Sequence, residues 1–391
     1  MRLVVKFGGS SLGSLKKIKE VAKFISHIKN TKADELVVVV SAMGNTTNDL
    51  IELAHKLNKT PQENHLAGLI HQGENLSASL LSLSLDSIGV KNEVLFAKNN
   101  VVHVKGSHTN AIITHIDTNL ILDNFKHNKV VIIPGFQGVN SKGEICTLGK
   151  GGSDTTAVAL GASLFSRVYI YTDVCGFYSC DPNQFKNSQK HQCIDIYSAI
   201  ELSSSGAKVM EQKSLEIAEK NNVQLKVCKS LTNLGTEICN KQLCSSHTKS
   251  IAFKSNLSYI TTNYKNETHL FDIVNESNNK IIFYDSFKIK NEHFSHFVID
   301  ICAKTLKKLL NNSSNSNFSS TQVKDCAIIT ITGSGLTTDE TFKVKLQNLI
   351  KNNNIITNQI AIFPTQVKII LPQKYVLTLA RLLHKELIEE Q

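Results

Sequence analysis

The segment from Lys6 to Ser11, which reads Lys-Phe-Gly-Gly-Ser-Ser, has the residue types that bind a phosphate group. It follows the apolar residues Leu3 to Val5 and precedes apolar residues at helical spacing, which predicts a strand-to-helix junction. Adjacent glycines let backbone N–H groups approach an anion, and Lys6 supplies a positive charge. An ordinary glycine turn is the alternative. The lysine precedes the glycines, whereas a P-loop lysine follows them, so the P-loop fold is disfavoured.

Three further segments have residues suited to a nucleotide. Pro134 to Gly138 follows an apolar strand, and Leu148 to Thr156, which contains Gly-Lys-Gly-Gly-Ser-Asp, leads into a helix and predicts a second anion site. In Tyr171 to Pro182, Asp173 or Asp181 could meet ribose or Mg²⁺, and Tyr178 could pack on a base. Structural interpretations remain open, because an Asp-Pro pair is a common turn and Asp173 could cap a helix.

Alternating strands and helices must position these segments. We expect strands at 3–7, 35–41, 94–96, 130–133, 168–172 and 225–227, and helices at 15–25, 154–164 and 206–220. The strands lack polar alternation, which is typical of a parallel sheet covered on both faces. Ligands of such sheets bind at the carboxyl ends of the strands. We therefore expect Lys6, Ser41, Gly135 and the pair Thr172–Asp173 to converge on one crevice.

The composition changes near residues 231–236, after which the glycine-rich segments stop. Two stretches with strand and helix patterns follow, and the Asn- and Ser-rich run 311–317 between them predicts a flexible linker. The second stretch predicts a strand at 327–332, a Gly-Ser-Gly turn at 333–335, a helix at 341–352, a hairpin at 360–371 and a helix at 376–387. This order is typical of ferredoxin-like modules. The expected domains are 1–235, 249–310 and 325–391.

Length and composition limit the class of protein. The 391 residues, 41% hydrophobic and 19% charged, are enough for two or three domains with hydrophobic cores. No apolar run is long enough for a membrane span and no export signal follows Met1, so we expect a cytoplasmic protein. The nine cysteines form no C-x-x-C pair and are expected to be reduced, without a metal site. The net charge of +10 comes from dispersed lysines, so no nucleic-acid partner is expected.

Seven segments, in this order, resemble the aspartokinases of the amino acid kinase family: Lys6 to Ser11, Ser41 to Leu50, Gly73–Glu74, Pro134 to Gly138, Leu148 to Asp154, Thr172 to Pro182 and Gly206 to Val209. The tail is similar to the paired ACT modules of that family, with a degenerate first module. The resemblance implies a three-layer, mostly parallel α/β domain followed by two ferredoxin-like α+β modules. It also implies ATP-dependent phosphorylation of the β-carboxylate of L-aspartate to 4-phospho-L-aspartate, the entry to lysine, diaminopimelate, threonine and methionine synthesis.

The resemblance also assigns roles to residues. Lys6 would stabilise the transferring phosphoryl group, Mg²⁺ would bridge the ATP phosphates, and Lys208, expected at the start of a helix, would be a second phosphate cation. Asp154 belongs with Lys6 and Lys208 in the catalytic group. Glu74 would pair with the α-ammonium group of aspartate, although without the resemblance a solvated helix carboxylate would be the favoured interpretation. The substrate-binding residues would be Ser41, which also lines the nucleotide pocket, Thr47, Glu74, Lys150, Gly151, Gly152 and Ser153. The ATP-binding residues would be Lys6, Gly8, Gly9, Ser10, Thr172, Asp173, Tyr178 and Asp181.

The sequence departs from the family pattern at several positions. Lys150 stands where arginine is usual, and a lysine cannot hold the α-carboxylate of the substrate with a bidentate fork. Asn183 also replaces a customary arginine. The first ACT-like module lacks the usual Asp-x-Pro-Gly turn, and the second has Ile362 to Gln366 in place of a Ser-Thr-Ser-Glu-like strand. We therefore expect weak feedback by lysine or threonine, and modules that serve mainly to form a homodimer or larger oligomer.

Three other functions remain as alternatives. Glutamate 5-kinase, acetylglutamate kinase and uridylate kinase share the expected fold but lack the Ser41 to Leu50 segment combined with an ACT-like tail. A catalytically weak sensor subunit would have no need for the cations Lys6 and Lys208. A nucleic-acid-binding regulator would require clustered basic residues, which the sequence does not contain.

Overall fold

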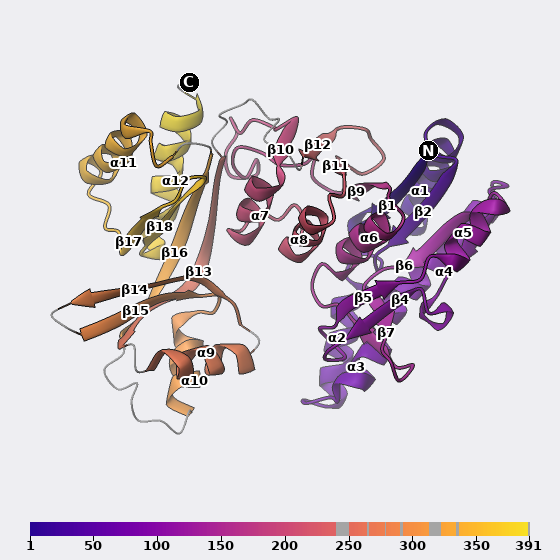
Figure 1. Ribbon diagram of the computed structural model, residues 1–391, viewed down its shortest axis with the longest axis horizontal. Coiled ribbons are helices and arrows are strands. Elements are labelled where there is room, and N and C mark those ends of the chain that lie inside the picture. The colour runs from indigo at the N-terminus through magenta and orange to yellow at the C-terminus, as the bar shows by residue number, and fades with distance from the viewer. Residues whose placement is uncertain are drawn as a thin grey trace. The chain divides into compact units, whose positions relative to one another are not determined.

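The computed structural model describes residues 1–239, 250–263, 266–277, 279–289, 292–312, 322–333 and 336–389. These residues form two compact units, the first with a large and a small sheet and the second with one sheet (Figure 1). The first unit contains Met1–Phe177, Lys190–Ile200 and the described residues of Lys208–Ser245. The second contains Tyr178–Gln189, Glu201–Ala207 and the described residues of Ser246–Gln391. The chain therefore passes between the units several times.

An eight-stranded sheet with the order β10-β12-β11-β9-β1-β2-β6-β3 forms the centre of the first unit. Its neighbouring strands are parallel except for the β11–β12 pair. β1, β2 and β6 are buried along nearly their whole lengths, as expected for apolar strands covered on both faces. The strands are β1 (Arg2–Phe7), β2 (Glu35–Val40), β3 (Asn92–Val94), β6 (Val130–Pro134), β9 (Arg167–Thr172), β10 (Cys193–Asp195), β11 (Leu225–Lys229) and β12 (Gly235–Cys239).

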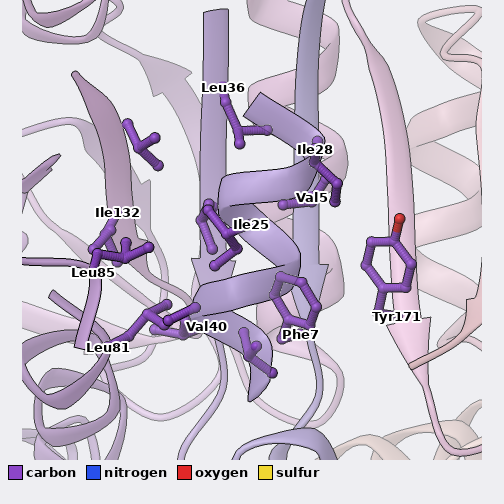
Figure 2. Close-up of a cluster of buried hydrophobic side chains, with 14 of the residues drawn as sticks. Val5, Phe7, Ile25, Ile28, Leu36, Val40, Leu81, Leu85, Ile132 and Tyr171 are labelled. Atoms are coloured by element: carbon purple, nitrogen blue, oxygen red, sulfur yellow. The ribbon is translucent and has the colours of Figure 1, made fainter. Parts of the chain in front are cut away.

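Helices α1 (Leu15–Thr31) and α4 (Gln72–Asp86) cover one face of this sheet. Figure 2 shows the resulting core, in which Ile25 and Ile28 of α1 and Leu81 and Leu85 of α4 lie against side chains of β1, β2 and β6. The aromatic ring of Phe7 stacks on Tyr171 of β9, with centroids 5.0 Å apart. Helix α6 (Gly152–Ser163) contacts β1, β2 and β9 and packs against α8 (Gln212–Lys220). The first unit therefore has the expected layered, mostly parallel α/β fold.

A smaller sheet, with the order β5-β4-β7-β8, also belongs to the first unit and was not predicted from the sequence. Its strands are β4 (Val102–Lys105), β5 (Ile112–Ile116), β7 (Gln137–Val139) and β8 (Ile145–Thr147). Helix α3 (Glu63–Ile70) contacts β8 of this sheet and also α2 (Thr46–Leu57), whereas α5 (Asn119–Lys126) contacts β2 and β6 of the large sheet. The strands of the small sheet are only three to five residues long, too short for a clear alternation of apolar residues.

The helix predicted at 206–220 is wrong at its start. Gly206, with φ of 112°, follows the end of α7 (Ile196–Ser204), and α8 begins only at Gln212. A glycine at positive φ commonly ends a helix, and the next residue, Ala207, donates its N–H to the carbonyl of Leu202. Lys208 therefore lies in an irregular segment, not at a helix start.

The second unit contains one antiparallel sheet with the order β14-β15-β13-β16-β18-β17. Each half has the order β-α-β-β-α, which confirms the elements predicted for the second stretch. The first half contains β13 (Ser250–Asn263), α9 (Glu267–Glu276), β14 (Ile281–Ile289), β15 (Glu292–Ile299) and α10 (Ala303–Asn312). The second contains β16 (Gln322–Thr332), α11 (Glu340–Asn352), β17 (Gln359–Ile362), β18 (Gln366–Leu371) and α12 (Val376–His384), which continues as a π-helical turn over Lys385–Glu389.

Strands β13 and β16, the first strands of the two halves, pair with each other and join the halves into one sheet. The expected domain limits of 1–235, 249–310 and 325–391 stay a prediction. The two compact units are each made of several segments of the chain, so their boundaries do not test limits drawn between continuous domains. Of the expected linker, 311–312 end helix α10 and 313–317 lie outside the described residues, as do Ser334 and Gly335 of the expected turn. Among the helices that the structure describes, none has the length and apolar character to cross a membrane.

Candidate active site

The carboxyl ends of four strands meet at one edge of the parallel sheet. Phe7 lies opposite both Val40 and Tyr171, and Val40 lies opposite Pro134. Lys6, Ser41, Gly135 and Thr172 therefore lie at the same edge of the sheet, as the strand pattern predicted, while their convergence on one crevice stays a prediction. Ser41 donates its N–H to the carbonyl of Phe7 at 3.1 Å, so the chain after β2 is fixed directly to the end of β1.

A buried ion pair occupies this edge. The Nζ of Lys6 lies 2.6 Å from Oδ1 of Asp154, and the two residues are only 8% and 9% exposed. Leu3, Val5 and Phe7 face the α1 side of the sheet, so the alternation of a strand turns Lys6 toward α6. Asp154 lies in the first turn of α6, where the helix dipole favours a carboxylate. The pair therefore fixes a cation at the end of β1, although the sequence did not show that these two residues touch.

The Lys6 to Ser11 segment packs closely against the chain after β2. Gly8 donates its N–H to the carbonyl of Tyr171 at 3.1 Å, and Gly44 donates to the carbonyl of Gly9 at 3.0 Å. A Cβ atom on Gly9 would lie 2.7 Å from the carbonyl oxygen of Ala42, so only glycine fits there. The Gly8 N–H is thus occupied within the protein, and the phosphate-binding roles of Gly8, Gly9 and Ser10 stay predictions.

Glu74 is buried, contrary to the interpretation as a solvated helix carboxylate. It is 3% exposed on α4, and its Oε1 accepts the N–H of Ala42 at 3.1 Å. Its Oε2 is buried and has no hydrogen-bond partner among the described residues. Burial raises the pKa of Glu74 from 4.5 to about 7. A cationic ligand that reached Oε2 would relieve the cost of this unpaired, desolvated carboxylate.

Glycines allow α6 to approach the sheet edge. A Cβ on Gly135 would lie 2.7 Å from the Cβ of Ser153, and one on Gly152 would lie 2.8 Å from the ring of Phe136. Gly151, at φ of 72°, precedes the first turn of α6. Gly151, Gly152 and Ser153 therefore place a helix N-terminus beside the strand ends, an arrangement that suits an anion. Their assignment to aspartate stays a prediction.

Lys150 lies at the surface next to this helix start. Its side chain is 92% exposed, and its Nζ is 3.3 Å from Oε1 of Glu211. The side chain of Glu211 packs against the backbone of Gly151, next to Lys150, because a Cβ atom on Gly151 would clash with it. Sequence reasoning gave Glu211 no role, because the long separation from Lys150 gives no signal of contact. The weak ion pair leaves Lys150 able to turn toward an anionic ligand.

The residues after β9 are divided between the two units. Thr172 donates its hydroxyl to Oδ1 of the exposed Asp173 at 3.0 Å, in the first unit. Tyr178 and Asp181 belong to the second unit. There Oδ1 of Asp181 accepts the N–H of Asn183 at 3.0 Å, and Oδ2 accepts the side-chain amide of Gln184 at 3.0 Å. Asp181 thus closes a local turn, as its structural interpretation expected, and its role toward a nucleotide stays a prediction.

Sequence reasoning missed further polar groups near this edge. Gln137 is buried in β7, where its amide donates to Oδ1 of Asn75 at 3.1 Å, and its Oε1 has no partner among the described residues.

A cavity of about 410 Å³ lies between α2 and α4. Thr47, assigned to the substrate from the sequence, lies in the first turn of α2 next to one residue of its lining. The lining residues are Thr46, Leu50, Gln72, Gly73, Asn75, Leu76 and Ser79.

The mostly parallel sheet, with a buried ion pair at the carboxyl ends of its strands, defines an α/β protein whose candidate site lies at that edge. Residues 1–229 match the amino acid kinase family, which is more than half of the chain, and the protein belongs to that family. It is 38% identical over 264 residues to the aspartokinase of Geobacillus stearothermophilus, a match that covers 66% of this chain and 64% of that protein. It is 28% identical over 396 residues to the aspartokinase of Bacillus sp. (strain MGA3), which covers 98% and 96%.

Solved structures show the same fold along the whole chain. E. coli aspartokinase III, in its complex with aspartate and ADP, has a TM-score of 0.82 at 20% identity, and the match covers 99% of this chain and 100% of that one. Clostridium acetobutylicum aspartate kinase has a TM-score of 0.70 at 18% identity over 98% and 100%. The chain thus has the fold of these proteins, while its match to the 38% identical relative spans about two thirds of each sequence.

Proposed function

We propose that the protein is an aspartate kinase, which transfers the γ-phosphoryl group of ATP to the β-carboxylate of L-aspartate and forms 4-phospho-L-aspartate. The observation that carries this proposal is the buried Lys6–Asp154 pair, with 2.6 Å between Nζ and Oδ1, at the edge where four strands end. The choice of aspartate as substrate is supported by the aspartokinase relative that is 38% identical over 264 residues.

The chemistry needs no proton abstraction. A carboxylate is already ionised, so the enzyme has to reduce its repulsion from the phosphate and hold the reacting oxygens in line. Lys6 provides a positive charge for the oxygens of the transferring group, and Asp154 holds its ammonium group in place. Lys208 is proposed as a second cation for the phosphates.

Glu74 is suited to the α-ammonium group of aspartate. Its buried, partnerless Oε2 offers an acceptor, and pairing with a cation would favour the ionised form of a carboxyl whose pKa burial has raised to about 7. Lys150 would pair with the α-carboxylate of the substrate, with Ser41, Thr47, Gly151, Gly152 and Ser153 beside it. The nucleotide would use Gly8, Gly9, Ser10, Thr172, Asp173, Tyr178 and Asp181.

We also propose that Mg²⁺ enters with the ATP phosphates, and that the exposed carboxylate of Asp173 offers a ligand of the kind this ion takes. The product would feed the synthesis of lysine, diaminopimelate, threonine and methionine in the cytoplasm. The two halves of the second unit are proposed to be ACT-like modules that support a homodimer or a larger assembly. The apolar residues of β16 and β18, which the sequence suggested for the interface, are buried in the chain's own core instead.

Coupled measurement of ADP release, with aspartate, glutamate and acetylglutamate as separate acceptors, tests the proposal. Aspartate alone should support turnover, and trapping the product with hydroxylamine should give the hydroxamate expected of an acyl phosphate. Turnover with glutamate or acetylglutamate but not with aspartate would contradict the proposal. It would favour glutamate 5-kinase or acetylglutamate kinase.

A further inference from the structure

A chain of side-chain hydrogen bonds runs from the buried Gln137 of β7 along the first turn of α4. The side-chain amide nitrogen of Gln137 lies 3.1 Å from Oδ1 of Asn75, and the amide nitrogen of Asn75 lies 3.3 Å from Oε1 of Gln72. The amide nitrogen of Gln72 is 3.2 Å from Nε2 of His71, whose Nδ1 is 3.0 Å from the carbonyl oxygen of Ala67. All of these residues belong to the first compact unit, so the whole chain of bonds lies within that unit.

The direction of these bonds is set at the His71 end. A carbonyl oxygen only accepts, so Nδ1 of His71 must donate to Ala67, and burial lowers the pKa of His71, which favours the neutral ring. In a neutral ring the other nitrogen, Nε2, is an acceptor, so the amide of Gln72 donates to it. Asn75 then donates to Oε1 of Gln72, and Gln137 donates to Oδ1 of Asn75. The chain therefore ends at Oε1 of Gln137, which can only accept.

This last oxygen has no donor among the described residues, although Gln137 is only 2% exposed. Turning the amide over would not supply one, because Oε1 would then face the acceptor oxygen of Asn75 and the existing bond would be lost. A buried carbonyl oxygen without a donor costs free energy, and a ligand that brings an N–H group to it recovers that cost. Oε1 of Gln137 is thus a buried acceptor whose orientation the chain of bonds has fixed.

Glu74 supplies a buried acceptor of the same kind. Its Oε2 has no partner among the described residues, and Glu74 directly precedes Asn75 in α4. Its other oxygen is bonded to Ala42, two residues beyond the end of β2, while Gln137 lies three residues beyond the end of β6, the strand beside β2. Both acceptors therefore belong to side chains held between the same turn of α4 and the ends of two neighbouring strands. The cavity between α2 and α4 is lined by residues of this turn.

We propose that Oε1 of Gln137 is an acceptor for the α-ammonium group of aspartate, together with Oε2 of Glu74. An ammonium group carries three N–H donors, so a carboxylate oxygen and an amide oxygen can both bind it. An acetylated nitrogen carries one N–H and no charge, so it cannot pair with both acceptors. Gln137 thus favours amino acids with a free amino group. The inference rests on the proposed aspartate kinase function and deepens it by naming a residue that determines substrate specificity.

Calorimetric titration of the full-length protein with aspartate tests the inference. Gln137→Met replaces the amide by an apolar group of similar length and should weaken aspartate binding about tenfold or more, the factor expected for a lost hydrogen bond to a charged group. In steady-state assays the KM for aspartate should rise by the same factor, while kcat stays within about twofold. Succinate, which has the two carboxylates of aspartate and no ammonium group, should inhibit the variant and the wild type with Ki values within about twofold of each other.

Asn75→Ala and Ser79→Ala separate the acceptor from general effects on α4. Asn75 is half-buried and alanine is a good helix former, so Asn75→Ala keeps the helix and the test does not depend on the folding of Gln137→Met. It removes the oxygen that orients the amide of Gln137, and aspartate binding should weaken about threefold. Ser79 lines the same cavity and donates its hydroxyl to the backbone carbonyl of Asn75, outside the chain of side-chain bonds. Ser79→Ala should bind aspartate as the wild type does, and all three variants should keep the wild-type affinity for ADP.

The outcomes separate the inference from the proposed function. Wild-type affinity for aspartate in Gln137→Met and Asn75→Ala, in a protein that phosphorylates aspartate, would overturn the inference alone. Equal weakening of aspartate and succinate in Gln137→Met, or weaker aspartate binding in Ser79→Ala, would indicate a general disturbance of α4 and would also overturn it. A wild-type protein that fails to phosphorylate aspartate would overturn the proposed function, and the inference with it.

Discussion

Glu74→Gln should make the protein more stable above pH 7 while weakening its binding of aspartate. Glu74 is 3% exposed, and burial raises its pKa from 4.5 to about 7, so its charged form is unfavourable in the folded protein. The folded state therefore binds this proton more tightly than the unfolded state does. The free energy of unfolding must then fall as the pH rises from about 4.5 to about 7, and this contribution is constant above that range.

The size of the effect follows from the difference between the two pKa values. At about 1.36 kcal/mol for each pH unit, the change from 4.5 to about 7 corresponds to ~3 kcal/mol. Glutamine cannot ionise, so this pH dependence disappears in the variant, while its amide oxygen still accepts the N–H of Ala42. Part of this change already occurs below pH 5, so between pH 5 and pH 8 the variant should gain ~2.5 kcal/mol in free energy of unfolding relative to the wild type.

Urea unfolding followed by circular dichroism at both pH values measures this difference. Glu20→Gln, a substitution of the same chemistry at an exposed position of α1, serves as the control and should have little effect at either pH. A Glu74→Gln variant whose stability relative to the wild type is the same at pH 5 and pH 8 would refute the reasoning.

The same ionisation should govern the binding of aspartate. Below pH 7 the α-ammonium group has to displace a proton from Glu74, so kcat/KM for aspartate in the wild type should fall about tenfold for each pH unit below pH 7. In Glu74→Gln the KM for aspartate should be high at every pH and should not show this fall. A wild-type KM for aspartate that does not change between pH 5.5 and pH 8 would separate Glu74 from the substrate.

Three more substitutions or titrations test the proposed function. Lys6→Ala should lower kcat by ~10² to 10³ and leave the circular dichroism spectrum unchanged, because it removes the cation held at 2.6 Å from Asp154; near-normal turnover would contradict its role. Lys150→Arg should lower the KM for aspartate, since a guanidinium can contact both carboxylate oxygens, and an unchanged or higher value would show a pocket built around lysine. Lysine and threonine, alone or together, should inhibit only weakly, and strong inhibition below millimolar concentration by either would refute that expectation.

The features that could be predicted from the sequence are those that depend on short segments. The strands β1, β2 and β6 are continuous apolar runs, and their parallel arrangement brings Lys6, Ser41 and Gly135 to one edge as expected. The start of α8 was predicted wrongly at Gly206. This glycine follows the end of α7, and its positive φ, which the sequence does not show, separates α7 from the irregular segment before α8. Contacts between distant residues, such as Lys150 with Glu211 and Ser179 with His384, leave no pattern in the sequence.

Two carboxylates of the first unit show how the same residue type takes different roles through its surroundings. Asp154 is buried next to a cation, so its charge is compensated before any ligand arrives, and it holds Lys6 in place. Glu74 is buried next to a single backbone N–H, so its charge is only partly compensated. A ligand with an ammonium group would gain more from Glu74 than from Asp154, because only Glu74 retains a buried acceptor without a cation. We therefore expect the uncompensated charge to cost stability in the free protein, and this cost would be recovered as binding energy if an ammonium group paired with Glu74.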